Sequence, residues 1–243
     1  VDKRNVLEAE RVVANDSGSG LKIIVTYGVL SIDIMVASLD TICDLADKYY
    51  ALVMIAECHA TGFIGETGRG TLEYKGVMGR IDIITGTLGK ALGGAMGGYT
   101  TGKKEIIDML RQRSRPYLFS NSLAPAIVGA SIKVFEMLAK DTSLRDTLEQ
   151  NTSYFKAGIK KVGFDIIDGD SAIVPVMLYD AKLSQTMAKM LLKEGIYVIG
   201  FFFPVVPKEK ARIRVQLSSA HTKEHLDKAI EAFTKVGKRL DII

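Results

Sequence analysis

The sequence has few of the residues on which disulfide-rich and membrane-spanning proteins are built. Only Cys43 and Cys58 among its 243 residues are cysteines, and two thiols cannot form a disulfide framework. No apolar run reaches the roughly 20 residues that a bilayer-crossing helix needs. The longest candidate, residues 196–206, is interrupted by Gly200 and Pro204. We therefore expect no membrane partner and a reducing compartment, the cytoplasm or, in a eukaryote, the mitochondrial matrix.

The chain also lacks a strong excess of charge of either sign. The 32 basic and 28 acidic side chains are interspersed and leave a net charge of +4. A nucleic-acid surface needs a concentrated basic stripe, so this balance argues against nucleic acid as a partner. Apolar residues make up 47% of the chain and charged residues 25%, which is typical of a globular protein with a substantial core.

The first block of the chain alternates strand and helix patterns. Ala51–Ala56 is apolar at every position, as in a parallel strand covered on both faces. Such alternation predicts βαβ units and an α/β layer, which we place in a domain of residues 1–140. Further strands are expected at 22–26, 80–85 and 98–101, and helices at Leu39–Tyr49, 105–111 and Pro125–Leu138.

The second block predicts a smaller α+β domain of residues 141–243. Strands are expected at 164–167, 173–178, 197–201 and Ala211–Gln216, and helices at 143–162, 182–194 and 223–240. The first block is short for a free-standing α/β domain, and the chain opens on Val1 with few strands ahead of its motifs. We therefore expect that an N-terminal portion of the fold is missing.

The densest chemical signal is the small-residue stretch 85–94, which presents a single lysine, Lys90, directly after a strand. A phosphate-binding P-loop is excluded because Ala91 stands where that motif needs Ser or Thr. Two interpretations remain. The stretch is either a tight turn with a solvated lysine, or a site where Lys90 forms a Schiff base while Thr87 and backbone N–H groups grip a phosphate.

A second signal is His59, which follows the strand Ala51–Ala56. The carboxyl ends of parallel strands are where α/β folds bind ligands, so His59 could act as a base or stack on a flat cofactor. A metal site is disfavoured because Cys58, the one nearby ligand type, is adjacent in sequence. The alternative is a histidine satisfied by backbone groups at the strand end.

A third pattern, His221 to His225, formally matches the H-x-x-E-H zinc signature. Thr222 has the character of a helix N-cap, which would leave His221 outside the helix that carries His225. We therefore favour a solvated helix start and expect no metal.

The strand Ala211–Gln216 carries a fourth signal. Alternation places Arg212 and Arg214 on one face and the apolar Ile213 on the other. A guanidinium held on a strand makes a good bidentate clamp for a carboxylate, and the alternative is a solvated strand face.

Taken together, the segments 85–98, 111–125, 200–207 and 211–222 closely resemble the α-oxoamine synthases, and among them the glycine C-acetyltransferases. The resemblance covers nearly the whole chain in several long ungapped stretches. It implies a fold-type-I pyridoxal-phosphate enzyme of α/β class, here an incomplete large domain followed by the small α+β domain. It also implies a homodimer with the active site at the interface.

The resemblance further implies a role for each matching residue. Lys90 is expected to bind pyridoxal 5'-phosphate as a Schiff base and then to shuttle a proton. His59 is expected to bind the phenolic oxygen of the cofactor ring, and Arg214 the carboxylate of the amino acid. The remaining cofactor contacts are expected from Thr87, Ser31, Ser120 and Asn121, the last two reaching the phosphate of the neighbouring subunit.

The function implied is acyl transfer from acetyl-CoA to glycine, in threonine and glycine metabolism. Ala56 replaces the family's aspartate that pairs with the pyridinium nitrogen, and adjacent Glu57 should point to the opposite face of the strand. A buried charge-assisted pair of this kind is worth roughly 2–5 kcal/mol, so its loss could slow turnover about a hundredfold or more. The alternative is a truncated or degenerate homologue that binds the cofactor or a partner chain without catalysis.

Overall fold

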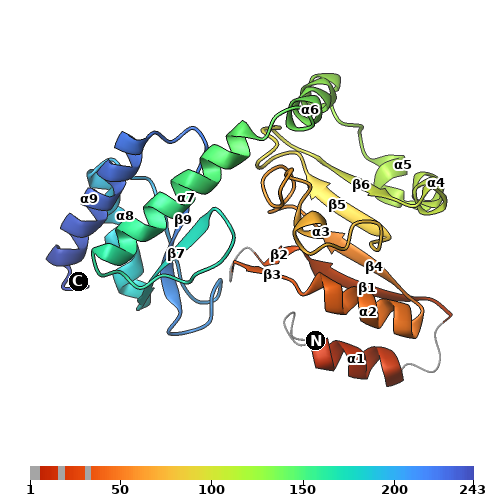
Figure 1. Cartoon of the computed structure of the whole chain (residues 1–243), viewed down its shortest axis with the longest axis horizontal. Coiled ribbons are helices and arrows are strands. Elements are labelled where there is room, and N and C mark those ends of the chain that lie inside the picture. The colour runs from red at the N-terminus through yellow and green to blue at the C-terminus, as the bar shows by residue number, and fades with distance from the viewer. Residues whose placement is uncertain (1–5, 16–19, 31–33) are drawn as a thin grey trace. The chain divides into compact units, whose positions relative to one another are not determined.

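The computed structural model describes residues 6–15, 20–30 and 34–243 of the chain (Figure 1). The chain divides into two compact units. The first consists of Val1–Leu30 and Val36–Thr142, and the second of Ser31–Met35 and Ser143–Ile243. Among the described residues, no helix is both long enough and apolar enough to cross a bilayer.

The first unit is built on a four-stranded sheet with the strand order β1-β4-β5-β6. β1 (Lys22–Tyr27), β4 (Ala51–Ala56) and β5 (Ile83–Thr87) are parallel, so their carboxyl ends meet at one edge of the sheet. β6 (Gly98–Gly102) is antiparallel to β5 because only a ten-residue loop, 88–97, joins them, and a parallel return would need a crossover of about a dozen residues or more. The expected α/β layer is confirmed, with an antiparallel edge strand added.

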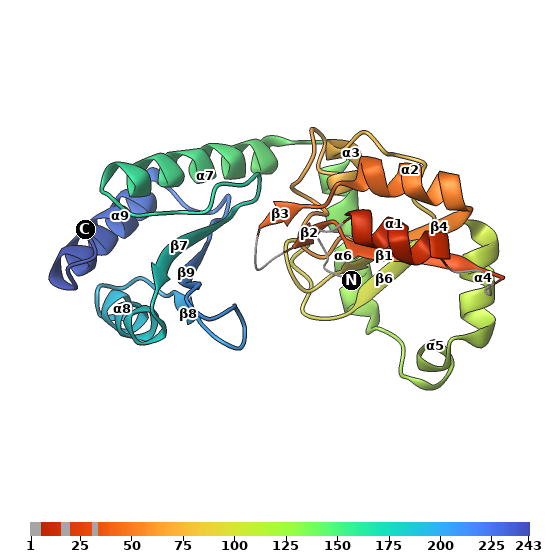
Figure 2. The ribbon, with the colours of Figure 1, turned by 90° about the horizontal axis from the view of Figure 1, so that it is seen from below.

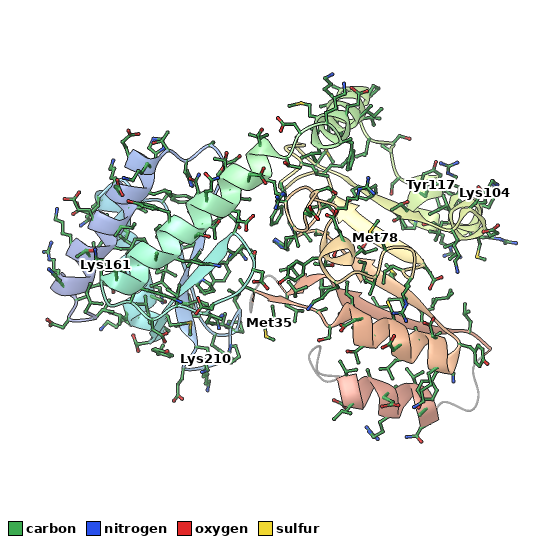
Figure 3. All side chains as sticks on the ribbon, viewed as in Figure 1. Met35, Met78, Lys104, Tyr117, Lys161 and Lys210 are labelled. Atoms are coloured by element: carbon green, nitrogen blue, oxygen red, sulfur yellow. The ribbon has the colours of Figure 1, made fainter. Side chains whose placement is uncertain are left out.

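Six helices and two short strands complete the described part of the first unit. α1, α3 and α5 lie outside every helix expected from the sequence. In Figure 3, Tyr117 of α5 lies at the surface. The bounds are α1 (Val6–Asn15), β2 (Val29–Leu30), β3 (Met35–Val36), α2 (Leu39–Tyr49), α3 (Thr71–Tyr74), α4 (Lys104–Arg113), α5 (Arg115–Phe119) and α6 (Pro125–Leu138), with Met35 of β3 counted in the second unit.

α2 covers one face of the sheet of the first unit and lies along β4 (Figure 2). Its apolar side chains recur at helical spacing, and Leu39 and Ile42 pack in one cluster with Val53 and Ile55 of β4. The odd-numbered residues of β1 point to the other face, where Ile23, Val25 and Tyr27 are 45%, 64% and 46% exposed. That face is therefore apolar and open to solvent.

α6 is a second uncovered apolar element of the first unit. Most of its 14 residues are apolar, yet Ser131 is its one buried residue and Ile132 is 57% exposed. A helix that is apolar all round is normally buried in a core. The helix begins at Pro125, as expected, because proline at the first helical position lacks only an N–H that would have no partner there.

The second unit closes a core of its own. Its antiparallel sheet has the order β7-β9-β8 and is packed with three helices around buried side chains that include Phe155, Met187, Leu191, Ile213 and Phe233. The bounds are α7 (Ser143–Lys161), β7 (Ile173–Tyr179), α8 (Ala181–Lys193), β8 (Ile199–Phe201), β9 (Ala211–Gln216) and α9 (Lys223–Arg239).

Two strand predictions in the second unit need correction. Residues 164–167 form only an isolated bridge, Ile166 to Val176, instead of a strand. Ile167 donates to the carbonyl of Pro175, but Pro175 has no N–H to return, so the ladder stops there. The strand expected at 197–201 begins only at Ile199.

Candidate active site

Lys90 and His59 meet at the carboxyl edge of the sheet in the first unit. Lys90 follows β5 and His59 follows β4, two parallel neighbours whose carboxyl ends lie side by side. Lys90 Nζ is 3.0 Å from His59 Nε2. The lysine is exposed, but it is not a lone solvated charge, because an imidazole nitrogen is its hydrogen-bond partner. The structure thus brings together two residues that the sequence singled out separately.

The loop that presents Lys90 is held by its own backbone. Leu88 N–H donates to the carbonyl of Gly97 at 3.0 Å, and Gly94 N–H donates to the carbonyl of Leu88 at 2.6 Å. Gly93 has a φ of +70°, a conformation that glycine adopts without strain. Leu88 and Leu92 are buried beneath the loop. Lys90 therefore projects from a fixed turn.

Thr87, the last residue of β5, uses its hydroxyl within this loop. Thr87 Oγ1 donates to the carbonyl of Gly97 and accepts from Gly89 N–H, both at 3.2 Å. A phosphate at this position would have to replace the Gly97 carbonyl as the acceptor of the hydroxyl proton. Phosphate binding by Thr87 stays a prediction.

The turn that carries His59 is organised by Glu57. The carbonyl of Glu57 accepts from the N–H groups of Ala60 and Thr61, each at 3.1 Å. Thr61 Oγ1 in turn accepts from Tyr99 OH on β6 at 3.1 Å. Burial raises the pKa of the Tyr99 hydroxyl, which stays protonated and able to donate.

Sequence reasoning missed Tyr99, although a signal was present. Tyr99 pairs across the sheet with Gly86, and its ring lies in the space that a side chain at position 86 would fill. A glycine inside a strand often marks such a close approach.

Glu57 is buried, and its side chain lies on the opposite side of the strand from Ala56. Its carboxylate accepts from the N–H of Thr71 at 2.8 Å and from the Thr71 hydroxyl. Burial raises the pKa of the Glu57 carboxyl, and the two bonds from Thr71 oppose that rise. Ala56 belongs to the opposite face by strand alternation, and its methyl group cannot pair with a ring nitrogen.

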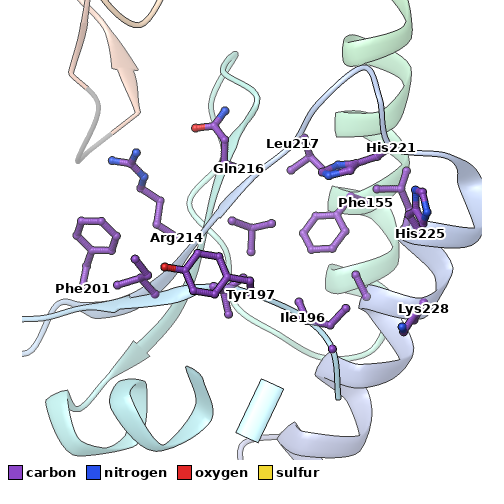
Figure 4. A pocket seen from close by; sticks show the side chains of 16 residues that line it. Phe155, Ile196, Tyr197, Phe201, Arg214, Gln216, Leu217, His221, His225 and Lys228 are labelled. Carbon is purple, nitrogen blue, oxygen red and sulfur yellow. The ribbon is translucent and has the colours of Figure 1, made fainter. Parts of the chain in front are cut away.

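Arg214 lies in the second unit, on β9, and lines a cavity of about 610 Å³ (Figure 4). Its guanidinium stacks over the ring of Phe201, 5.1 Å from the centroid, and burial lowers the pKa of the group. Arg212 is itself buried and donates from Nε to the carbonyl of Lys210 at 3.0 Å. The interpretation of this strand face as solvated is therefore wrong for Arg212. Arg214 is half-buried.

The two histidines of the H-x-x-E-H pattern line the other end of this cavity (Figure 4). Nδ1 of His221 accepts from Ser218 N–H at 3.2 Å, and Nδ1 of His225 accepts from Thr222 N–H at 3.1 Å. Thr222 is the N-cap of α9, so the helix-start interpretation is confirmed. Within residues 6–15, 20–30 and 34–243, no three His, Cys, Asp or Glu side chains gather as metal ligands would.

Three further residues were predicted to contact the cofactor, namely Ser120, Asn121 and Ser31. Ser120 and Asn121 follow α5 and are exposed on the first unit. Ser31 lies outside the described residues. The roles assigned to these three residues stay predictions.

Known proteins are similar to this chain over most of its length. The model of the family "Aminotransferase class I and II" matches residues 5–233. The 2-amino-3-ketobutyrate coenzyme A ligase of Escherichia coli K12 is 58% identical over 237 residues, which are 98% of this chain and 60% of that protein. The mitochondrial ligase of Homo sapiens is 51% identical over 218 residues, 90% of this chain and 52% of that protein.

Solved structures give the same fold. A serine palmitoyltransferase of Sphingomonas wittichii superposes with a TM-score of 0.93 at 27% identity, covering 99% of this chain and 60% of its own. A structure described as "SPT with PLP internal aldimine" gives 0.94 at 29% identity, covering 98% of this chain and 60% of its own. The predicted fold-type-I class is confirmed. The chain spans between 52% and 60% of the length of these relatives.

Proposed function

Because the chain belongs to the aminotransferase class I and II family, and within it to the α-oxoamine synthases, we propose that it binds pyridoxal 5'-phosphate at Lys90. The reaction we propose is the condensation of glycine with acetyl-CoA, which gives 2-amino-3-oxobutyrate and coenzyme A. The relatives named as 2-amino-3-ketobutyrate coenzyme A ligases support this choice of substrates.

The observation that carries the proposal is the 3.0 Å contact between Lys90 Nζ and His59 Nε2. An amine can bind an aldehyde only when it has lost a proton, and an imidazole at hydrogen-bond distance is suited to take that proton. The two groups lie at the strand-end edge where α/β folds bind their ligands.

The residues present fit most of the cofactor. Lys90 would hold it covalently, His59 would lie beside its ring, and Thr87 with the N–H groups of the 88–97 loop would hold its phosphate. When bound, pyridoxal phosphate supplies an electron sink for negative charge on the α-carbon of an amino acid. One place fits poorly, because Ala56 offers no carboxylate to a ring nitrogen.

The substrate would be oriented by Arg214, whose half-buried guanidinium is suited to clamp a carboxylate. The centroid of the Phe201 ring lies 5.1 Å from the central carbon of the guanidinium, close enough for the face of the ring to attract the cation. We further propose a homodimer in which Ser120 and Asn121 reach the phosphate site of the neighbouring subunit.

A second candidate function is binding without turnover. Two observations favour it, namely Ala56 at the ring-nitrogen position and the span of only about 60% of the relatives' length. In that case Lys90 would still bind the cofactor, but glycine would not be activated.

Cofactor binding is tested by adding pyridoxal phosphate to the purified protein and reducing the product with borohydride. A single adduct on the peptide that contains Lys90 is expected, together with an absorption band near the visible edge. Lys90→Ala should remove both, whereas Lys104→Ala, an exposed lysine on α4, should keep both. An adduct that persists in Lys90→Ala would refute the assignment.

The two candidate functions are separated by Ala56→Asp. If the chain is catalytic but weakened by the missing carboxylate, this variant should raise glycine-dependent release of coenzyme A by about a hundredfold. Ala56→Asn, which has a similar shape without the charge, is the matched control. No gain with aspartate, in a protein that still binds the cofactor at Lys90, would favour binding without turnover.

A further inference from the structure

Glu57 is the most deeply buried carboxyl group among the residues that the structure describes, with 1% of its surface exposed. Burying a charged group is costly unless it is hydrogen-bonded, so its position calls for an explanation. The proposed function assigns it no role.

The Glu57 carboxylate occupies a site shaped to receive it. Thr71, the first residue of α3, donates to it from both its N–H, at 2.8 Å, and its hydroxyl. Gly28 and Gly70 flank it, and a side chain at either position would collide with the carboxylate oxygens. The carboxylate thus ties the end of β4 to the start of α3.

The backbone of Glu57 controls the turn that carries His59. Its N–H donates to the carbonyl of Thr85 on β5 at 2.8 Å, and its own carbonyl accepts from Ala60 and Thr61. His59 lies between these anchor points. Its ring reaches Lys90 Nζ from a turn whose first residue is fixed at the backbone and at the side chain.

We propose that Glu57 is a positioning residue that holds His59 against Lys90, by tying the 57–61 turn to the start of α3. It acts through the turn, which its side chain ties to Thr71 and its backbone ties to Thr85. The part of this inference that concerns the cofactor rests on the proposed function, whereas the contact itself does not.

A purely structural role is the competing explanation, and Glu73 provides the control for it. Glu73 accepts three hydrogen bonds in the neighbouring loop, from Thr67 N, Thr67 Oγ1 and Arg69 N. Glu73→Met therefore removes a loop-binding carboxylate without touching the 57–61 turn. Glu57→Gln is the conservative variant, because its amide can accept from the Thr71 N–H and donate to the Thr71 hydroxyl.

The first test uses the protein without cofactor. With labelled histidine and lysine, the nuclear Overhauser effect between the His59 ring and the Lys90 side chain should be visible in the unaltered chain, Glu57→Gln and Glu73→Met. It should be lost in Glu57→Met. If that variant does not fold, Thr71→Val, which removes only the hydroxyl donor, should weaken the signal. A contact that survives both Glu57→Met and Thr71→Val would overturn the proposal.

The second test follows pyridoxal phosphate binding at Lys90. The lysine nitrogen bonds to the aldehyde carbon, the aldehyde oxygen leaves as water, and borohydride hydride then fixes the bond. We expect Glu57→Met to slow this trapping about tenfold, and His59→Ala about a hundredfold, as for loss of a proton acceptor. Glu57→Gln should stay within about twofold of the unaltered chain.

The decisive arm repeats Glu57→Met in the His59→Ala background. If Glu57 acts through His59, the substitution should slow trapping no further there, because two substitutions that act through the same residue are not additive. An equal slowing with and without His59, or the same slowing in Glu73→Met, would make Glu57 merely structural. If the unaltered chain forms no adduct at Lys90, the proposed function fails, and the contact measured without cofactor still decides the positioning role.

Discussion

The two units of the chain differ in how completely each buries its own apolar residues. In the second unit, aromatic and aliphatic side chains from all three helices meet on the sheet, and Phe155, Ile159 and Phe233 are fully buried. The first unit buries one sheet face under α2 but leaves the odd-numbered face of β1 and nearly all of α6 in contact with solvent.

The relatives contain additional chain that could pack on an apolar surface of this kind. The matched proteins are longer, and this chain spans about 60% of each of the bacterial ligases. Large contiguous apolar surfaces on a protein usually mark places where another polypeptide segment packs. The unit that carries the proposed cofactor lysine is therefore also the unit that leaves more of its apolar side chains exposed to solvent.

The largest expected contrast comes from removing one apolar side chain in each unit. Phe233 packs edge-to-face on Phe155 and Phe164, so Phe233→Ala should destabilise the second unit by about 3–5 kcal/mol. Ile132 on α6 is 57% exposed, and Ile132→Ala should change the stability of the first unit by no more than about 0.5 kcal/mol.

Hydrogen exchange followed by mass spectrometry measures both effects, because peptides from each unit are read separately. Loss of protection confined to the second unit is expected for Phe233→Ala. A comparable loss in the first unit for Ile132→Ala would mean that α6 is covered after all, and the contrast between the units would not hold.

The sequence predicted those parts of the fold whose signals are local. β4, α6 and β9 have the expected bounds because an unbroken apolar run, a proline at the helix start and strict alternation each mark them directly. Segment 164–167 failed as a strand because its partner includes Pro175, which has no N–H to donate, and the apolar pattern of the segment itself does not reveal that partner.

In the site, too, only the features that follow from local signals were predictable from the sequence. Lys90 and His59 each follow a strand, so their meeting is a consequence of parallel order. The burial of Glu57 was not predictable, because it depends on Gly28 and on the pair Gly70 and Thr71, two separate segments that only the fold brings together. The Tyr99 contact with Thr61 likewise arises only when β6 folds back against β5.

A smaller effect of pH is expected from Glu57 in the first unit. Burial raises the pKa of Glu57 above its usual value of 4.5. A carboxyl whose pKa is raised by folding contributes stability that is fully present below that usual value, and the contribution is lost as pH rises through the folded pKa. Glu57→Gln cannot titrate, so it should lack this loss.

The measurement is the unfolding free energy of both proteins, followed from about pH 4 upward by hydrogen exchange in the first unit. Stability of the unaltered chain relative to Glu57→Gln should fall as pH rises. Parallel curves for the two proteins would show that the Glu57 carboxyl titrates alike in the folded and unfolded chain.

The smaller of the two losses of stability predicted for the second unit is at a helix cap. Thr222 Oγ1 accepts from His225 N–H while His225 Nδ1 accepts from Thr222 N–H, so each residue satisfies a backbone group at the start of α9. Thr222→Ala should destabilise the second unit by about 1 kcal/mol, and Thr222→Ser, which keeps the hydroxyl, should restore most of it. Because α9 packs into a closed core, the loss should spread to peptides of α7 and β9 in hydrogen exchange. Loss confined to the first turn of α9 would mean that the second unit is less cooperative than its burial implies.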